Sequence, residues 1–484
     1  MTLPLVVSLL SGCAVGPDYV SPSIALPTSW SGDKERPQQP SSLLLAQWWR
    51  RLDDPLLNEL IDEAVQGNLD VAAAKARIRE ARASLLQSIG ALLPQISGSG
   101  SATANRSAAG VASDRVGVST FNQFQAGFDS AWELDLFGAN RRAVEAATYD
   151  VEASEEDLRT TLLTLIGDVA SYYVEARGYQ ARVTLARRTA ASQRSTAALT
   201  QNKVNAGSAS AVDAAKAAAQ AASTEATIPT NEASYKQALH RLGVLLARDP
   251  AALAARLDRA TPIPAPRMPL PKGIPADVLT MRPDVRKAER QLARYTAKIG
   301  QAEAALYPDV SLSGSVSTTA LKLGDLGKNS TIGWSIGPTL SVPIFNGGKL
   351  RAAVEVAQAQ RDEYHVGWRS AVLKALEDVE NAVVALAQER IRIRSLAEAA
   401  ARYGEAARLS RSLYESGSSS FLDVLDAERS QFSAEDALLQ SRVSVAKNYV
   451  ALAKALGGGW NGAIDGSKPD VVDTGTGPHL ARIR

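Results

Sequence analysis

One pentapeptide of the chain, Gly333 to Gly337, matches the GxSxG motif in which serine hydrolases place a nucleophilic serine. That serine must stand on a sharp turn between a strand and a helix, where its hydroxyl attacks a carbonyl carbon. Ser335 instead lies inside a segment of alternating residues, Pro338 follows it, and no helical pattern begins before Phe345. We therefore keep an esterase only as a minor alternative, which Ser335→Ala would test.

The chain lacks the residues that most other site chemistry needs. One cysteine excludes a CxxC metal site and an internal disulfide, and three scattered histidines disfavour a metal centre; they are His240, His365 and His479. Neither the GxxxxGKS/T phosphate loop nor the HExxH zinc motif occurs. The 53 basic and 51 acidic residues nearly balance, which argues against a nucleic-acid binder. We predict no catalytic residue, no metal and no cofactor.

The elements that carry the polar residues occur twice, because the chain contains a duplicated half. Residues 68–101 align with 282–315, and residues 143–247 align with 353–457. Each half is predicted to run helix, strand, loop, strand, very long helix, tight turn, long helix. The predicted divisions are a signal peptide at 1–12, a lipidated extended segment at 13–55, a first repeat at 56–247, a Pro-rich linker at 248–283, a second repeat at 284–460 and a disordered tail at 461–484.

Each half contains a predicted hairpin of long strands, at about 94–137 and 308–345, whose residues alternate with period two. One face is apolar and the other is small and polar. Soluble strands average about five or six residues, whereas strands of about 9–11 residues suit a tilted transmembrane strand. Four strands cannot close a barrel, and open edges are forbidden in lipid. Three copies, with 12 strands, are the smallest assembly that closes around a pore, because eight strands have a filled interior.

Proline-free segments predict two helices of roughly 100 Å, at 139–205 and 347–416. Four shorter helices would flank them, at 211–247, 421–456, 56–92 and 284–306. Pro229 predicts a kink or local break in the first half only, because its counterpart is Leu439. The fold class is therefore mainly α with a small transmembrane β part. A periplasmic coiled-coil scaffold is the alternative from another class, but it does not explain the strands.

An apolar run at residues 3–10 leads into Leu10-Ser11-Gly12-Cys13. Such a run before small residues is typical of a secretory signal and is too short to span a bilayer. No Lys or Arg precedes the run, so we expect a truncated signal peptide. The tetrapeptide resembles a bacterial lipobox, which implies that Cys13 carries the lipid and becomes the first residue of the mature chain.

Five short motifs, in order along the chain, carry a family resemblance. They are Cys13 to Pro22, Trp48 through Asp70, Arg282 to Val285, Val342 to Gly348, and Ala455 to Trp460. With the duplication, the whole chain resembles the TolC/OprM-type outer-membrane factor family, in its lipoprotein branch. The resemblance implies a homotrimer with a 12-stranded β-barrel on a long periplasmic α-helical barrel. It also implies a periplasmic adaptor and an inner-membrane pump as partners, often of the resistance-nodulation-division type.

A member of this family is a passive, gated duct of a tripartite efflux system in the bacterial outer membrane, lipid-anchored and projecting into the periplasm. A duct for type I protein secretion is the near alternative, because the residues do not specify the cargo.

The resemblance also implies where the functional residues lie. The turns between the long helices would form the periplasmic tip that docks the adaptor, with Gly207, Ser208, Asp213, Gly417, Ser418 and Asp423. The same residue types cap and terminate helices, so a purely structural role accounts for part of this pattern. The gate candidates are Arg408, Arg411, Tyr414, Glu415 and Ser419, and the candidates for a membrane girdle are Phe128, Trp132 and Trp334.

Overall fold

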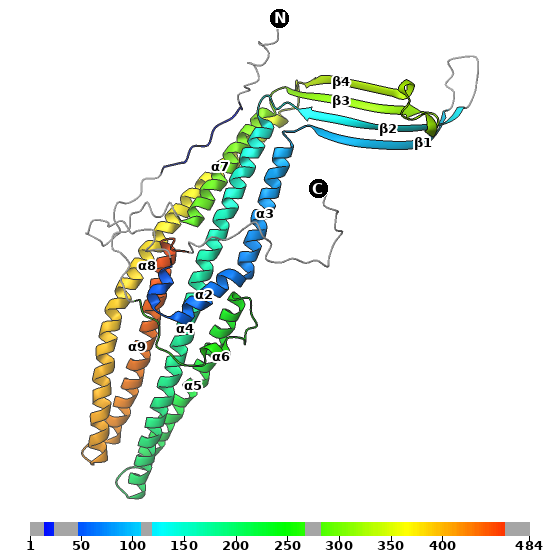
Figure 1. Ribbon diagram of the computed structural model, residues 1–484. Helices are drawn as coiled ribbons and strands as arrows, with labels where there is room; N and C mark the ends of the chain where they lie inside the picture. Colours follow the sequence, from blue (N-terminus) through cyan, green and yellow to red (C-terminus); the bar gives the residue numbers. More distant parts are fainter. Residues whose placement is uncertain (1–13, 24–46, 108–118, 267–281, 460–484) are drawn as a thin grey trace. The chain divides into compact units, whose positions relative to one another are not determined.

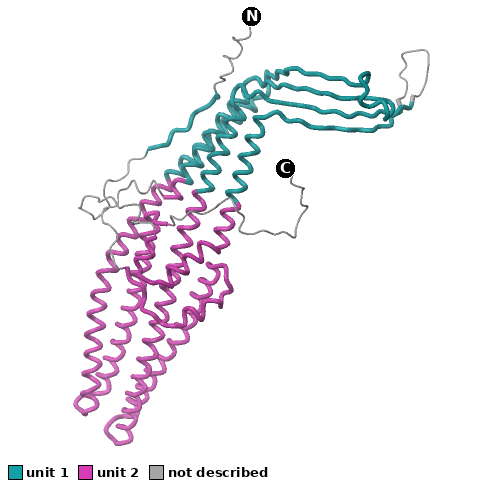
Figure 2. The backbone as a smooth tube through the Cα atoms, in the orientation of Figure 1, with its two compact units in different colours: residues 1–23, 77–155, 287–369 teal, residues 24–76, 156–286, 370–484 magenta. Residues whose placement is uncertain are grey.

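A computed structural model describes residues 14–23, 47–107, 119–266 and 282–459 of the chain. The predicted signal peptide, Cys13 and the predicted tail at 461–484 lie outside these residues. The chain divides into two compact units, shown in different colours in Figure 2. Unit 1 comprises Met1–Ser23, Arg77–Glu155 and Lys287–Arg369, and unit 2 comprises Ile24–Ala76, Glu156–Arg286 and Ser370–Arg484. Both halves of the duplication contribute to each unit, so the repeats are interleaved.

Unit 1 contains one antiparallel sheet of four strands, labelled in Figure 1. The strands lie in the order β1 (Gln95–Ser107), β2 (Ser119–Glu133), β3 (Asp309–Ala320) and β4 (Ile332–Ser341). The central pairing joins β2 of the first half to β3 of the second, from Phe124 opposite Ala320 to Glu133 opposite Ser311. Each half therefore contributes one hairpin, and the two hairpins form a single sheet.

The sheet has one apolar face and one polar face, because neighbouring residues of a strand point to opposite sides. Phe128, Val316 and Trp334 lie opposite one another in a row across three strands, on the apolar face. The next row, on the polar face, holds Asp129, Ser315 and Ser335. The described strand residues of this polar face include three acidic residues and no lysine or arginine; the acids are Asp129, Glu133 and Asp309.

The helices of the two halves correspond in length. The helices α4 (Ala139–Asn205) and α8 (Lys349–Glu415) have 67 residues each, and α5 (Ala211–Leu245) and α9 (Phe421–Ala455) have 35 each. At 1.5 Å per residue, α4 and α8 are each about 100 Å long. The shorter helices include α2 (Pro55–Gly67), α3 (Leu69–Gly90), α6 (Ala254–Leu257) and α7 (Pro283–Ala304). Among the described residues, no helix is both long enough and apolar enough to cross a membrane.

The prediction of a single helix at 56–92 is wrong. Asn68 has an extended backbone and separates α2 from α3. Its side-chain oxygen accepts hydrogen bonds from the amides of Asp70 (2.8 Å) and Val71 (3.1 Å), and its amide group donates to the carbonyl of Leu245 (2.8 Å). The apolar periodicity continues across this position, but the asparagine acts as an N-cap and starts a new helix.

Of the kink or local break predicted at Pro229, the break is wrong, since α5 runs through this residue, and the kink stays a prediction. Proline removes one amide donor from a helix, so nearby carbonyls need other partners. Two side chains in the adjacent turns also bond to the helix backbone: the Thr227 hydroxyl donates to Thr224 O (2.7 Å) and the Asn231 amide donates to Thr227 O (2.9 Å).

The segment at 248–266, the described part of the predicted linker, is packed rather than extended throughout. Leu253 and Leu257 are fully buried around the short helix α6. The buried guanidinium of Arg177 in α4 donates to the carbonyl of Arg259 at 2.8 Å. The proline-rich pattern did not reveal these two leucines as core residues.

Candidate functional site: the helical turns and the polar cluster beside them

Both turns between the long helices begin with the same backbone motif. Gly207 and Gly417 have φ values of +74° and +81°, a left-handed conformation that other residues adopt at a cost. Each following serine donates its backbone N–H to a carbonyl five residues earlier, at 2.8 Å, from Ser208 to Lys203 and from Ser418 to Leu413. Both helices therefore end in a Schellman motif, which satisfies the last carbonyls.

Both turns also end with the same side-chain motif. Ser210 and Ser420 are the N-caps of α5 and α9, and each forms a capping box with the aspartate three residues later. In the second turn the Asp423 carboxylate accepts hydrogen bonds from the Ser420 hydroxyl (2.9 Å) and amide (3.2 Å). The hydroxyl bond, followed by the amide bond, lowers the pKa of Asp423 below its usual value. Asp213 and Asp423 thus have a defined structural role in these turns.

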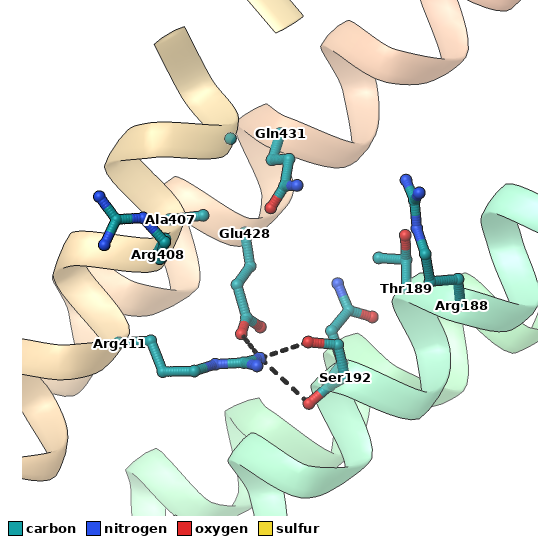
Figure 3. Close-up of a pocket in the computed structure, with 10 residues that line it drawn as sticks. Arg188, Thr189, Ser192, Ala407, Arg408, Arg411, Glu428 and Gln431 are labelled. Atoms are coloured by element: carbon teal, nitrogen blue, oxygen red, sulfur yellow. Dashed lines mark hydrogen bonds and ion pairs between the residues drawn. The ribbon is translucent and has the colours of Figure 1, made fainter. Parts of the chain in front are cut away.

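A partly buried polar cluster joins three helices next to the second turn. The guanidinium of Arg411 in α8 forms an ion pair with Glu428 of α9. It also donates to the hydroxyls of Ser192 (2.5 Å) and Thr196 (2.8 Å) of α4, and Thr196 in turn donates to Glu428 at 2.8 Å. Figure 3 shows Arg411 directed at Glu428 and Ser192, in a pocket of about 310 Å³. The Glu428 side chain is 9% exposed, so its charge depends on these partners.

Tyr414 connects the same helices through its ring and its hydroxyl. Its side chain is buried, and its hydroxyl donates to Thr200 of α4 at 3.2 Å. The ring packs against Phe421 of α9, with centroids 5.9 Å apart, and the Lys203 ammonium lies 4.9 Å from the ring centroid. Tyr414 belongs to an apolar cluster with Phe421, Val424 and Ala217 of α5. Tyr414 and Arg411 are therefore the gate candidates that make contacts between helices.

The other gate candidates do not join this cluster. Arg408 lines the pocket, but Figure 3 shows its guanidinium pointing away from Glu428. Glu415 is exposed, and neither it nor Arg408 has an ion pair or side-chain hydrogen bond with the described residues. The Ser419 hydroxyl lies 3.3 Å from the Asp423 carboxylate as a donor within the turn, and Ser418 accepts from Ser416 at 3.2 Å.

The aromatic residues predicted for one girdle lie at two levels of the sheet. Phe128 and Trp334 lie in the same row, on either side of Val316, and both are exposed. Trp132 lies four residues along β2, roughly 13 Å away at the rise of a strand. Its indole N–H donates to the carbonyl of Leu92 at 3.0 Å, so it is tied to the segment that follows α3.

Sequence reasoning did not find Glu428, Ser192 and Thr196. Glu428 follows Phe421 by seven residues and Val424 by four, which places a carboxylate on the buried face of α9. A charged residue at such a position was the available signal. The two partners in α4 had no distinguishing pattern, because serine and threonine at single positions are common in long helices.

Comparison with known proteins identifies the family. Residues 60–248 and 274–458 match the family model described as outer membrane efflux protein. The chain belongs to this family. Each half of the duplication matches one of the two segments, in agreement with the repeat found in the sequence. The esterase alternative has no support here, since Ser335 lies inside β4 and its hydroxyl is 2.9 Å from that of Ser315.

Named relatives and solved structures agree with this assignment. Nodulation protein T of Rhizobium leguminosarum bv. trifolii is 36% identical, over 95% of this chain and 97% of the relative. The solvent efflux pump outer membrane protein SrpC of Pseudomonas putida is 32% identical, over 94% and 97%. The solved structure of the outer-membrane channel OprN superposes with a TM-score of 0.85 at 35% identity, covering 93% of this chain and all of that one. The present chain is therefore the outer-membrane channel of a tripartite efflux system, and it is not an enzyme.

Proposed function

We propose that three copies of the chain close a 12-stranded barrel and form one continuous efflux duct. The observation that carries this proposal is the sheet with two open edges: β1 pairs only with β2, and β4 only with β3, among the described residues. A membrane-spanning sheet cannot leave such edges in lipid, so β4 of one copy must pair with β1 of the next. Eight strands enclose no aqueous channel, whereas 12 strands leave room for one.

A second feature that supports association is an apolar stripe along α8. The stripe consists of exposed large residues separated by 7, 11, 7 and 18 positions, which are close to whole numbers of helical turns: Val366, Leu373, Val384, Ile391 and Leu409. These residues therefore lie on one side of the helix. An exposed apolar stripe of this length indicates a protein partner, and in the proposed assembly that partner is the next copy of the chain.

In this assembly the polar face of the sheet would line the lumen, and the apolar face would contact lipid. Phe128 and Trp334 would then be lipid-facing aromatic residues, and Trp132 would mark a second level nearer to the helices. The lipid on Cys13 would add an anchor in the same membrane.

The turns with Gly207, Ser208, Asp213, Gly417, Ser418 and Asp423 would form the periplasmic tip and dock the adaptor. The pump would be of the resistance-nodulation-division type. Arg411 and Tyr414 would hold α8 and α9 against α4 and keep the entrance narrow, and the exposed Arg408 and Glu415 and the half-buried Ser419 would contribute at the entrance. The proposal assigns the gate to a cluster that is already formed within one chain.

The test combines oligomeric mass with single-channel conductance of the detergent-purified protein in a planar bilayer. We expect a trimer with low conductance in the wild type and a several-fold higher conductance for the Arg411→Met trimer. Arg392→Met is the matched control, because Arg392 lies on the same helix and, among the described residues, forms its ion pair with Glu389. A monomer without conductance would refute the duct, and a conducting trimer that does not respond to Arg411→Met would refute the gate assignment.

A further inference from the structure

The segment at 14–21 belongs to unit 1 and is held in place there by side chains from both halves of the chain. Arg142 of α4, in the first half, binds its beginning, and Glu289 of α7, in the second half, binds its end. No sequence pattern predicted a binding partner for this segment.

Arg142 forms hydrogen bonds with the backbone of the segment. Its side chain is 5% exposed, and its guanidinium donates to the carbonyls of Val15 (3.1 Å) and Gly16 (3.1 Å) and to the carboxylate of Asp18 (2.8 Å). The amide of Val15 donates at 3.1 Å to the carbonyl of Phe137, which lies between β2 and α4. A buried guanidinium needs such acceptors, because leaving it without them is costly.

Glu289 holds the other end of the segment. Its carboxylate accepts hydrogen bonds from the hydroxyls of Tyr19 (2.8 Å) and Ser21 (2.9 Å). Burial alone would raise the pKa of Glu289, but these two bonds and the charge of Arg290 outweigh burial and lower it. The ring of Tyr19 also packs edge-on against Tyr149 of α4, with centroids 5.8 Å apart.

Three glycines make room for the segment at its closest approach. A Cβ on Gly16, which has a φ of +90°, would lie 2.3 Å from the Cα of Gly300. A Cβ on Gly300 would lie 2.8 Å from the carbonyl oxygen of Val15, and one on Gly138 would lie 2.8 Å from the Cα of Ala14. Any larger residue at these positions would therefore push the segment out.

We propose that residues 14–21 form a docked strap that holds the start of the mature chain at the junction between β2 and α4, and so fixes the depth of the membrane anchor. This inference rests on the proposed lipid at Cys13, which lies outside the described residues. Ala14 is one peptide unit from residue 13, about 3.8 Å between Cα atoms. An undocked strap of eight residues would instead allow the anchor a reach of about 27 Å, close to the roughly 30 Å of a hydrocarbon core. Docking therefore converts a loose tether into a fixed attachment.

The experiment measures strap docking and membrane insertion in the same set of variants. A cysteine at position 20, where Val20 is 81% exposed, carries a spin label, since Cys13 is the chain's only native cysteine and is blocked by the lipid. The first double variant, Arg142→Met/Glu289→Gln, changes the two residues that bind the strap. The second, Asp18→Asn/Tyr19→Phe, changes the strap itself. The matched control is Arg294→Gln, because Arg294 lies on α7 like Glu289 and its guanidinium pairs with Asp150 at 2.6 Å. If Arg142→Met/Glu289→Gln fails to fold, the second double variant still tests whether the strap is docked.

We expect a mobile label in both double variants, amide exchange at Val15 faster by about tenfold or more, and a several-fold smaller fraction of chains inserted in the outer membrane. The control should match the wild type in all three. A label that stays immobile would overturn the assignment of Arg142 and Glu289. A mobile label with an unchanged inserted fraction would overturn the proposal that the strap fixes the depth of the membrane anchor.

Two further measurements separate this inference from the proposed function. Wild-type protein that forms no conducting trimer would refute the proposed duct, but it would not change what the label shows about docking of the strap. If Cys13→Ala inserts as well as the wild type, the lipid anchor does not act in insertion and the depth inference falls with it, whether or not the label shows a docked strap.

Discussion

Removing Arg411 and removing Glu428 from their ion pair should reduce local stability by different amounts. In Arg411→Met the Glu428 carboxylate, 9% exposed, retains only the hydroxyl of Thr196 among its described partners. In Glu428→Gln, by contrast, the charge left behind is that of Arg411, whose side chain is 31% exposed and keeps the Ser192 and Thr196 acceptors. The loss of stability should therefore be larger in the variant that removes the arginine.

The expected magnitudes follow from that difference in solvation. Removing one partner of a buried pair costs 3–5 kcal/mol, and we take about 3 kcal/mol for Arg411→Met because the arginine is partly exposed. Glu428→Gln should cost about 1 kcal/mol, the value of one ordinary hydrogen bond. The double variant Arg411→Met/Glu428→Met should recover most of the loss, since an apolar pair of similar volume leaves no buried charge.

Hydrogen exchange of the amides at the end of α8, such as Ser416, which bonds to Ser412 O at 3.1 Å, reports this local stability. Arg411→Met should accelerate exchange by about a hundredfold or more, and Glu428→Gln by about fivefold. Equal acceleration in the two single variants, or a double variant worse than Arg411→Met, would show that the buried carboxylate does not govern the cluster.

Four more predictions concern the cap, its pH dependence, the lumen and the stripe. Ser420→Ala should cost about 1 kcal/mol and accelerate exchange in the first turn of α9, with Ser210→Ala as the equivalent in α5. Because Asp423 has a lowered pKa, its stabilising contribution is complete near pH 7 and should fade below about pH 4, seen as faster exchange of the same amides. Asp129→Lys should reduce the preference of the channel for potassium over chloride, measured as a reversal potential, since the described polar face has only acidic charges. Ile391→Glu should shift the trimer toward monomer in mass measurements by placing a charge in the α8 stripe.

Features set by local chemistry were predictable from the sequence. Alternation placed Phe128 and Trp334 on one face, because a strand reverses side-chain direction at every residue. Gly207 and Gly417 marked the turns, because a left-handed position at a helix end favours glycine. The absence of proline indicated the long helices α4 and α8. Each of these signals acts within a few residues and survives any tertiary arrangement.

Features set by distant partners were not predictable. Asn68 caps a helix and binds Leu245, which follows it by 177 positions. Arg142 binds a segment that precedes it by more than a hundred positions. Glu428 has partners in two other helices. In each case the residue type was visible, but only the folded chain supplies the partner that decides whether it is a cap, a clamp or an exposed charge.

The duplication explains why one turn has a polar cluster and the other does not. The two turns share the same Schellman motif and capping box, so the backbone solution was kept in both halves. With the offset of 210 residues, Arg411 corresponds to Gln201 and Glu428 to Ala218, and Tyr414 corresponds to Val204. The first turn therefore lacks the ion pair. A chain that contains both halves can change one turn without changing the other, which six identical hairpins could not do. In the proposed trimer, polar-clustered and plain hairpins would alternate around the entrance, so that release of three Arg411–Glu428 pairs could open it while the other three hairpins keep their packing.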